Sequence, residues 1–472
     1  MAAVQARRSA RPGQAPSARP VAADCALAAL FSHFRCPPFI DSVAPADAPS
    51  GRPGFFRFGG AIGYGRLAGD SPAERADGLL PVAAATPARS GATLPFDLAE
   101  VVDNLRRERY ARGSTGRLAA LASRKATREL YYRLRPALPI TVRKYVQRLR
   151  WRGWRDIPFP RWPVETSVEG LMRGALATLL RLSGVRELPF IWFWPGGARA
   201  CATMTHDVEG HRGMAFADRL MDLDDEHGVK AAFQLVPAGA AKITDRLVQR
   251  FRGRGFEVNI HDLNHDGHLF RDRQTFQERA ARINEYVRAF GCRGFRAGSM
   301  YRKQEWLDAL DVSYDMSVPN VAHLEPQQGG CCTVFPYFVG DVLELPLTTA
   351  QDYTLFHVLG DYSIDLWKQQ IEIIAAQNGF ISFIVHPDYV ADRRALAVYK
   401  ELLAHLAQCA RETPLWLAMP GEVDSWWRHR QQMRLVEEGG RWRVEGPDSA
   451  RARVAWASIE SGRLTLRVEA AA

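Results

Sequence analysis

The stretch ACATMTHDVE, residues 200–209, is the part of the sequence that decides the fold. Small and apolar residues are followed directly by polar and charged ones, as at the carboxyl end of a buried strand. Downstream, short apolar runs alternate with helical segments at residues 273–290, 361–377 and 392–409. In chain order the runs are ACATM, KAAFQLV, FEVNI, GFRA, VLELPL, FISFIV and PLWLAM. This alternation predicts an α/β domain over residues 199–425, with a parallel sheet that is open or closed into a barrel.

The rest of the chain predicts further segments. Residues 1–22 are rich in Ala, Arg and Pro and predict a disordered arm. Residues 23–198 predict a mainly helical accessory region, which the prolines of RDIPFPRWPVE interrupt. At residues 426–472, a helix leads to the runs RWRVEG and RLTLRVE, which predict a small β appendage.

Composition excludes several classes of protein. The chain has 472 residues, 47% hydrophobic and 24% charged, unlike a disordered, collagenous or coiled-coil chain. No apolar run approaches the roughly 18 residues of a spanning helix, and no apolar core of a secretory signal follows the basic start. Seven cysteines without a CxxC pair are typical of reduced, buried thiols. We therefore expect a cytoplasmic protein.

Positive charge is concentrated in residues 101–155, which hold sixteen Lys and Arg against three Asp and Glu. Within this segment four apolar residues follow helical spacing, namely Val142, Tyr145, Val146 and Leu149. A basic amphipathic helix with Trp151 and Trp154 just beyond it is typical of contact with an anionic membrane surface. A solvated basic face that packs on the chain's own domain explains the pattern more simply. No nucleic-acid-binding motif accompanies the charge, so we expect no nucleic acid partner.

Ionisable residues follow four of the predicted strands. Because the carboxyl ends of parallel strands meet at one edge, where active sites of such folds form, we expect these residues to lie together. They are Asp207 and Glu209 after ACATM, His261 and His265 after FEVNI, Arg296 after GF, and His386 after FISFIV.

Two of these strand ends predict a metal site. His261 and His265 are four residues apart, so both imidazoles can reach one ion from a helical turn or a loop. Asp207 and Glu209 are two apart and point to one face of an extended strand. One carboxylate can bind the metal while the other takes a proton from water, whose pKa a bound metal lowers to about 7.

The other two strand ends complete a hydrolytic site. His386 can donate a proton to a leaving amine, since the ordinary pKa of histidine lies near 6.5. Arg296 can orient the carboxylate base through a charge-assisted hydrogen bond. Together these residues predict hydrolysis of an amide.

The segments THDVE, HDLNH, RAGSMYR and IVHPD, in this order, resemble the motifs of NodB-type polysaccharide deacetylases, carbohydrate esterase family 4. The resemblance covers residues 199–425 and implies a distorted (β/α) barrel, one divalent metal that is usually zinc, and removal of acetyl groups from N-acetylated sugars. The segments LPFD, RWPVE, PFIWFWPGG, YDMSVPN and ELPLTT resemble a branch associated with bacterial capsules and exopolysaccharides. The resemblance implies Glu209, His261 and His265 as metal ligands, Asp207 as base, Arg296 as the group that steadies it and His386 as acid.

The first and second motifs depart from the family pattern. Val208 separates two acids that are usually adjacent, so the swapped assignment, with Asp207 on the metal and Glu209 as base, stays open. In the second motif Asp262 replaces the common Ser or Thr. We expect His268 near the site but not on the metal, and His206 in packing.

These inferences predict a metal-dependent deacetylase acting on a surface polysaccharide or its precursor. In the cytoplasm the substrate would be a lipid-linked glycan precursor, and residues 101–155 would contact the inner face of the membrane. The alternative is a catalytically inactive NodB-like module that binds carbohydrate or serves as a scaffold in polysaccharide assembly. A non-sugar amide as substrate is a third hypothesis.

Overall fold

The computed structural model describes residues 27–39, 43–45, 51–69, 71–79, 81–82, 86–88, 91–112, 151, 153–241 and 243–469. The predicted arm at residues 1–22 and the predicted amphipathic helix at residues 142–149 lie outside the described residues. Among the described helices, none combines the length and the apolar composition needed to cross a bilayer.

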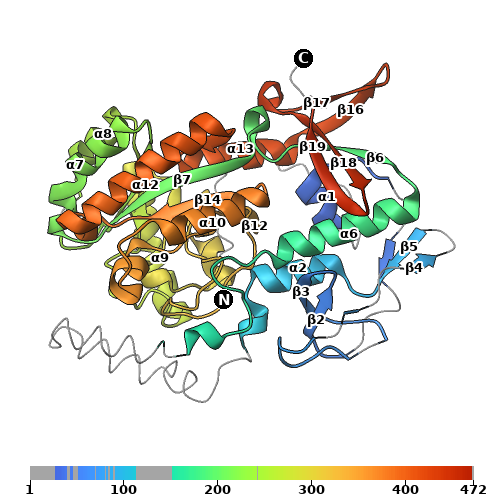
Figure 1. Ribbon diagram of the computed structural model, residues 1–472. Helices are drawn as coiled ribbons and strands as arrows, with labels where there is room; N and C mark the ends of the chain where they lie inside the picture. Colours follow the sequence, from blue (N-terminus) through green and yellow to red (C-terminus); the bar gives the residue numbers. More distant parts are fainter. Residues whose placement is uncertain are drawn as a thin grey trace, which may run out of the picture.

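The larger part of the molecule is a curled, mostly parallel sheet (Figure 1). Its strands, from one edge to the other, are β12 (Tyr337–Val339), β13 (Val342–Glu344), β11 (Tyr314–Asp315), β10 (Gly294–Arg296), β9 (Glu257–His261), β8 (Ala231–Leu235), β7 (Ala200–Val208) and β14 (Phe380–Ile384). β15 (Leu415–Leu417) pairs with the beginning of β7, and β12 runs antiparallel to β13. This arrangement confirms the predicted distorted (β/α) barrel.

Side chains close the gap between the segment after β13 and strand β14. Thr348 Oγ1 donates a hydrogen bond to Phe380 O at 2.8 Å and accepts one from Ser382 N at 2.9 Å. Thr349 Oγ1 donates to Ser382 O at 2.7 Å. Threonine hydroxyls therefore replace a backbone ladder here, and this is where the barrel is distorted.

Helices lie around the outside of the sheet (Figure 1). They are α7 (His211–Glu226), α8 (Asp245–Gly253), α9 (Arg273–Phe290), α10 (Asp365–Ala376), α11 (Pro387–Val390) and α12 (Arg393–Glu412). α9 illustrates how the sequence sets the ends of a helix: the Asp272 side chain accepts the Thr275 N–H, and Gly291 ends the helix with a φ of 58°.

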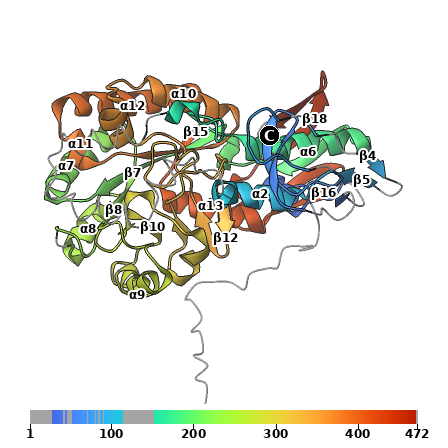
Figure 2. The same ribbon diagram turned by 90° about the horizontal axis from the view of Figure 1, so that it is seen from below.

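A second part combines the N-terminal region with the C-terminal strands, which lie together at one side of the barrel in both views (Figures 1 and 2). Its helices are α1 (Ala28–Phe34), α2 (Leu98–Arg106) and α6 (Ser167–Ser183), and its strands are β1 (Val43–Pro45), β2 (Gly54–Phe58), β3 (Ala61–Gly65), β4 (Thr86–Ala88), β5 (Gly91–Leu94), β6 (Glu187–Ile191), β16 (Arg434–Glu438), β17 (Arg441–Glu445), β18 (Val454–Glu460) and β19 (Arg463–Val468). β18 pairs antiparallel with both β6 and β19, and α6 contacts this sheet. The C-terminal strands thus share a sheet with the N-terminal region.

Helix α13 (Pro420–Gln432) joins this second part to the barrel and spans the predicted boundary between residues 425 and 426. Arg430 on α13 is fully buried and donates to backbone carbonyls of the second part, Trp192 O at 3.0 Å and His33 O at 2.9 Å. Carbonyl oxygens therefore satisfy most of the donors of this buried guanidinium.

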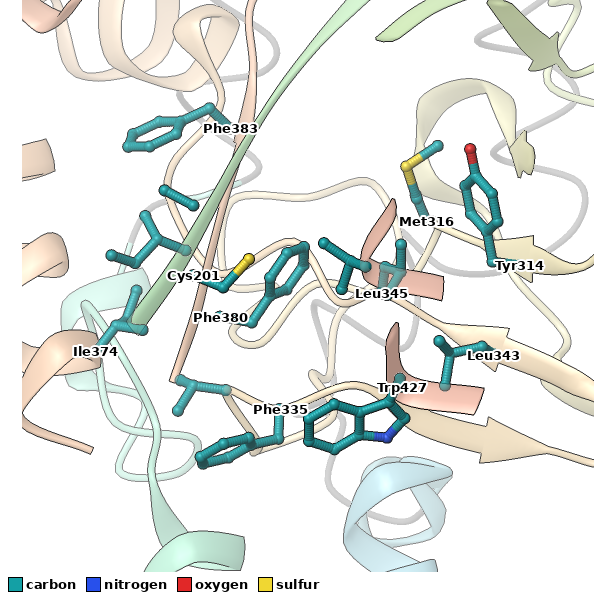
Figure 3. Close-up of a cluster of buried hydrophobic side chains, with 14 of the residues drawn as sticks. Cys201, Tyr314, Met316, Phe335, Leu343, Leu345, Ile374, Phe380, Phe383 and Trp427 are labelled. Carbon is teal, nitrogen blue, oxygen red and sulfur yellow. The ribbon is translucent and has the colours of Figure 1, made fainter. Parts of the chain in front are cut away.

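The apolar core fills the barrel near the amino ends of its strands. Figure 3 shows Cys201 of β7 and Phe380 of β14 among this cluster, together with Phe335, Leu345 and Trp427. Because alternate residues of a strand share a face, the face of β7 that carries Cys201 carries polar side chains further along, at the carboxyl end. The polar site therefore sits above an apolar floor.

Candidate active site

The structure brings the six predicted residues together at the carboxyl edge of the sheet. Asp207 lies near the end of β7 and Glu209 follows it, His261 ends β9, and Arg296 ends β10. His386 follows β14, and His265 lies in the loop after β9.

Glu209, His261 and His265 place one donor atom each within 4.8 Å of the others. Glu209 Oε1 is 3.0 Å from His265 Nε2 and 3.9 Å from His261 Nε2. His265 has a φ of 56°, so the two histidines meet across a loop and not along a helix.

The chemistry of these donors fits a divalent metal. His261 Nδ1 lies 3.1 Å from Arg296 O, which makes Nδ1 the protonated nitrogen and leaves the Nε2 lone pair free. Nε2 of both histidines is buried and, among the described residues, forms no hydrogen bond of normal geometry. Two imidazoles and a carboxylate are a donor set of catalytic zinc sites.

Asp207 and Arg296 form a buried ion pair beside these donors. Arg296 Nη1 donates to Asp207 Oδ1 at 2.6 Å and to Thr205 Oγ1 at 2.8 Å, and Arg296 Nε donates to Met316 O at 3.1 Å. Burial alone would raise the pKa of Asp207, but the charges of Arg296, His261 and His386 lower it below the usual value. Asp207 is therefore ionised, with Oδ2 turned toward His261 Nε2 at 3.7 Å.

His386 lies beside Glu209 and follows β14, the strand next to β7. Its Nδ1 is 2.6 Å from Asp352 Oδ1, its backbone N–H donates to Asp352 Oδ2 at 2.7 Å, and its Nε2 is 3.6 Å from Glu209 Oε1. Burial disfavours the imidazolium, but Asp352 first and then Glu209 outweigh it and raise the pKa of His386 to about 10. His386 is thus protonated and carries a proton on Nε2.

Asp352 is a residue of the site that the sequence analysis missed. A signal existed, because Asp352 is another acidic residue shortly after an apolar run, VLELPL.

The sequence analysis also missed the contact that Asp388 makes. Its Oδ1 accepts the Gly213 N–H at 2.9 Å, in the first turn of α7. A carboxylate at a helix amino end is favourable, so Asp388 ties α7 to the loop that holds His386.

The loop after Arg296 is anchored to the N-terminal region. Arg302 is buried and forms a two-pronged ion pair with Glu108, in which Nε donates at 2.7 Å. Glu108 Oε1 also accepts the Gly330 N–H at 2.6 Å, and Tyr110 Oη donates to Gly330 O at 2.6 Å. The accessory region therefore holds the rim of the site.

The remaining motif residues lie outside the donor group. His206 is fully buried, with Nδ1 3.1 Å from Val385 O and Nε2 3.0 Å from Asp224 Oδ2. His268 Nδ1 lies 3.5 Å from Asp266 Oδ2. Asp262 Oδ1 accepts the Leu263 N–H at 2.6 Å, while Oδ2 is buried and has no hydrogen-bond partner among the described residues.

No family model and no curated protein matches the chain. Solved structures similar to it include a protein described as a polysaccharide deacetylase from Mycobacterium smegmatis, with 19% identity, a TM-score of 0.42, and coverage of 52% of this chain and 96% of that one. Puue allantoinase is similar at 13% identity and a TM-score of 0.41, over 50% of this chain and 92% of its own. Peptidoglycan deacetylase PdaC from Bacillus subtilis is similar at 11% identity and a TM-score of 0.33, over 49% and 93%. At these identities and TM-scores the similarity carries no inference about function.

Proposed function

We propose that the protein is a metal-dependent deacetylase that hydrolyses the N-acetyl group of a sugar in a surface polysaccharide or its precursor. One observation carries the proposal: two oppositely charged proton carriers lie beside a three-residue donor group. Asp207 is held ionised next to His261, and His386 is held protonated next to Glu209. An acid and base pair is typically formed by two titratable groups whose surroundings shift their pKa values in opposite directions.

Glu209, His261 and His265 would hold the metal, and zinc suits this donor set. When bound, the ion would supply a Lewis acid that polarises the acyl carbonyl and lowers the pKa of water. We assign the ligand role to Glu209 and not to Asp207, because the Asp207 carboxylate is already engaged by Arg296 at 2.6 Å.

Two side chains of the protein would transfer the protons of the reaction. Asp207 would accept a proton from the attacking water at Oδ2, the oxygen that Arg296 does not hold. His386 would donate from Nε2 to the nitrogen that leaves, while Asp352 fixes the ring through Nδ1. Arg296 and Asp352 thus have matching tasks, each orienting one of the two proton carriers.

The test is metal stoichiometry by elemental analysis, followed by acetate release from a panel of N-acetylated glycans. We expect about one divalent ion per chain, lost in the His261→Ala/His265→Ala variant together with activity. Wild-type protein without metal after reconstitution would overturn the proposal. If the protein binds metal but hydrolyses only a non-sugar amide, the proposal of a sugar substrate is wrong. If it binds metal and hydrolyses no amide, the alternative of an inactive binding module is favoured.

We propose further that the reaction takes place in the cytoplasm on a lipid-linked glycan precursor, a substrate that a basic segment facing the membrane would suit. Residues 101–155 would then bring the protein to the anionic membrane. Co-sedimentation with anionic liposomes should be strong for the wild type and weak for a variant with reversed charges in this segment. Equal behaviour of the two proteins would contradict the membrane contact without affecting the deacetylase proposal.

A further inference from the structure

Two acidic side chains lie next to each other on the outer face of the sheet. Asp315 of β11 and Glu344 of β13 are register partners in neighbouring parallel strands, and neither has any exposed surface. Figure 3 shows their neighbours Tyr314, Met316 and Leu343 in the apolar cluster, and the register Gly294↔Tyr314 places Tyr314 on the face of the sheet that carries Arg296. Because side chains alternate along a strand, Asp315 and Glu344 point to the opposite face.

The two carboxyl groups are close enough for each to act on the pKa of the other. Each has one oxygen with another donor: Asp315 Oδ1 accepts from Ser317 Oγ at 2.6 Å, and Glu344 Oε1 accepts from Val318 N at 2.9 Å. The other oxygens, Asp315 Oδ2 and Glu344 Oε2, are buried and accept no hydrogen bond from any other described group. A hydrogen bond between two carboxyl groups requires a proton, because carboxylates only accept.

The basic groups that act on this pair are already engaged. Arg296 acts on Asp315, and Arg302 acts on Glu344. Their ion-pair partners are Asp207 and Glu108. Two further buried negative charges would therefore lack counterions, which is costly. Burial and the neighbouring Asp315 raise the pKa of Glu344 well above its usual value, in keeping with a proton on this residue.

One serine connects the pair of Asp315 and Glu344 to the candidate active site by hydrogen bonds. Ser317 Oγ, which donates to Asp315, accepts the Ala297 N–H at 2.9 Å. Ala297 directly follows Arg296, whose Nε donates to Met316 O. A chain of hydrogen bonds thus runs from Asp315 through Ser317 to the backbone that carries Arg296, and Glu344 lies beside Asp315 at its outer end.

We propose that Asp315 and Glu344 share one proton and act as positioning residues, fixing Arg296 and through it Asp207 from the outer face of the sheet. Both residues belong to the segments YDMSVPN and ELPLTT, for which the site itself gives no role. The catalytic consequence rests on the proposed function, whereas the shared proton and the fixed loop do not.

The first test is infrared spectroscopy in D₂O at neutral pH. Wild-type protein should show the carbonyl stretch of protonated, buried carboxyl groups, and Glu344→Gln should lose the part that Glu344 contributes beside Glu169, whose pKa burial raises to about 7. Glu187→Gln, at an exposed carboxylate of β6, is the control that leaves the spectrum unchanged. A wild-type spectrum without this band would overturn the shared proton.

The second test separates positioning from stability. Glu344→Gln keeps an N–H donor for Asp315 and should behave like wild type, whereas Glu344→Leu leaves Asp315 charged and without a donor. Hydrogen exchange of the peptide 294–302 should be faster in Glu344→Leu alone, and this readout needs no substrate. If acetate release is established, kcat of Glu344→Leu should fall roughly 10²-fold at unchanged metal content, as for a misplaced catalytic group. The positioning role would be overturned if peptide 294–302 exchanged at the same rate in both variants, or if Glu344→Gln exchanged faster than wild type. Neither outcome would affect the deacetylase proposal.

Discussion

The ion pair between Glu108 and Arg302 should couple the N-terminal region to the barrel by several kcal/mol. Its side chains are 9% and 2% exposed, so neither charge is well solvated. Replacing Glu108 by Gln leaves Arg302 buried without its counterion, and Arg302→Met leaves Glu108 with the Gly330 N–H as its donor. Removing one partner of a buried pair costs about 3–5 kcal/mol. The double variant removes both charges and should cost much less than the sum of the two single changes.

Urea unfolding followed by circular dichroism would measure the free energy of unfolding of all four proteins. We expect a coupling energy of about 3 kcal/mol or more from this double-mutant cycle. Asp77→Asn, which breaks an exposed pair with Arg75, is the control and should leave the stability nearly unchanged. Additivity of the two single changes within about 0.5 kcal/mol would refute the reasoning, because independent sites behave in that way.

Three further predictions concern separate parts of the molecule. Burial lowers the pKa of His323 from 6.5 to about 4. Between these pH values His323 is therefore protonated in the unfolded chain but not in the folded chain. Stability measured by urea unfolding should therefore fall by about 3 kcal/mol as the pH drops from 6.5 to 4, and less in His323→Phe; equal pH dependence would contradict this. Asp207→Asn should keep its metal by elemental analysis but lose about 10²–10⁴-fold in turnover, and unchanged turnover would remove it as the base. A Cβ at Gly213 would overlap Asp388 Oδ2, so Gly213→Ala should cost about 1–3 kcal/mol in thermal unfolding, whereas Gly253→Ala, with open space around it, should not.

Much of the barrel could be predicted from the sequence, because its strands are continuous apolar runs that end in ionisable residues. ACATM and FISFIV correspond to β7 and β14, and the predicted helix at residues 273–290 is α9. Parallel strands bring their carboxyl ends to one edge by geometry, which is why residues far apart in sequence could be expected near one another.

What the sequence could not supply depends on tertiary contacts. Asp352 begins a short helical segment that continues as the π-helical turn Thr354–Leu359, where no periodic pattern marks its orientation toward His386. The pairing of Asp315 with Glu344 depends on strand register, which neither strand encodes by itself. The shared sheet of β6 and β18 joins two segments that the whole barrel separates in the sequence, and local periodicity carries no information about such a partner.

That shared sheet has a consequence for synthesis on the ribosome. β6 leaves the exit tunnel before the barrel does, with Leu188, Phe190 and Ile191 ready for burial, whereas β18 follows only after the whole barrel has been translated. While the barrel is being translated, the nascent chain carries an unpaired strand edge, the kind of surface on which aggregation starts. A chain that stops before residue 454 lacks this partner, so the pairing of β6 distinguishes chains that contain β18 from chains that do not. Chaperone engagement of this edge should therefore last until β18 has been translated.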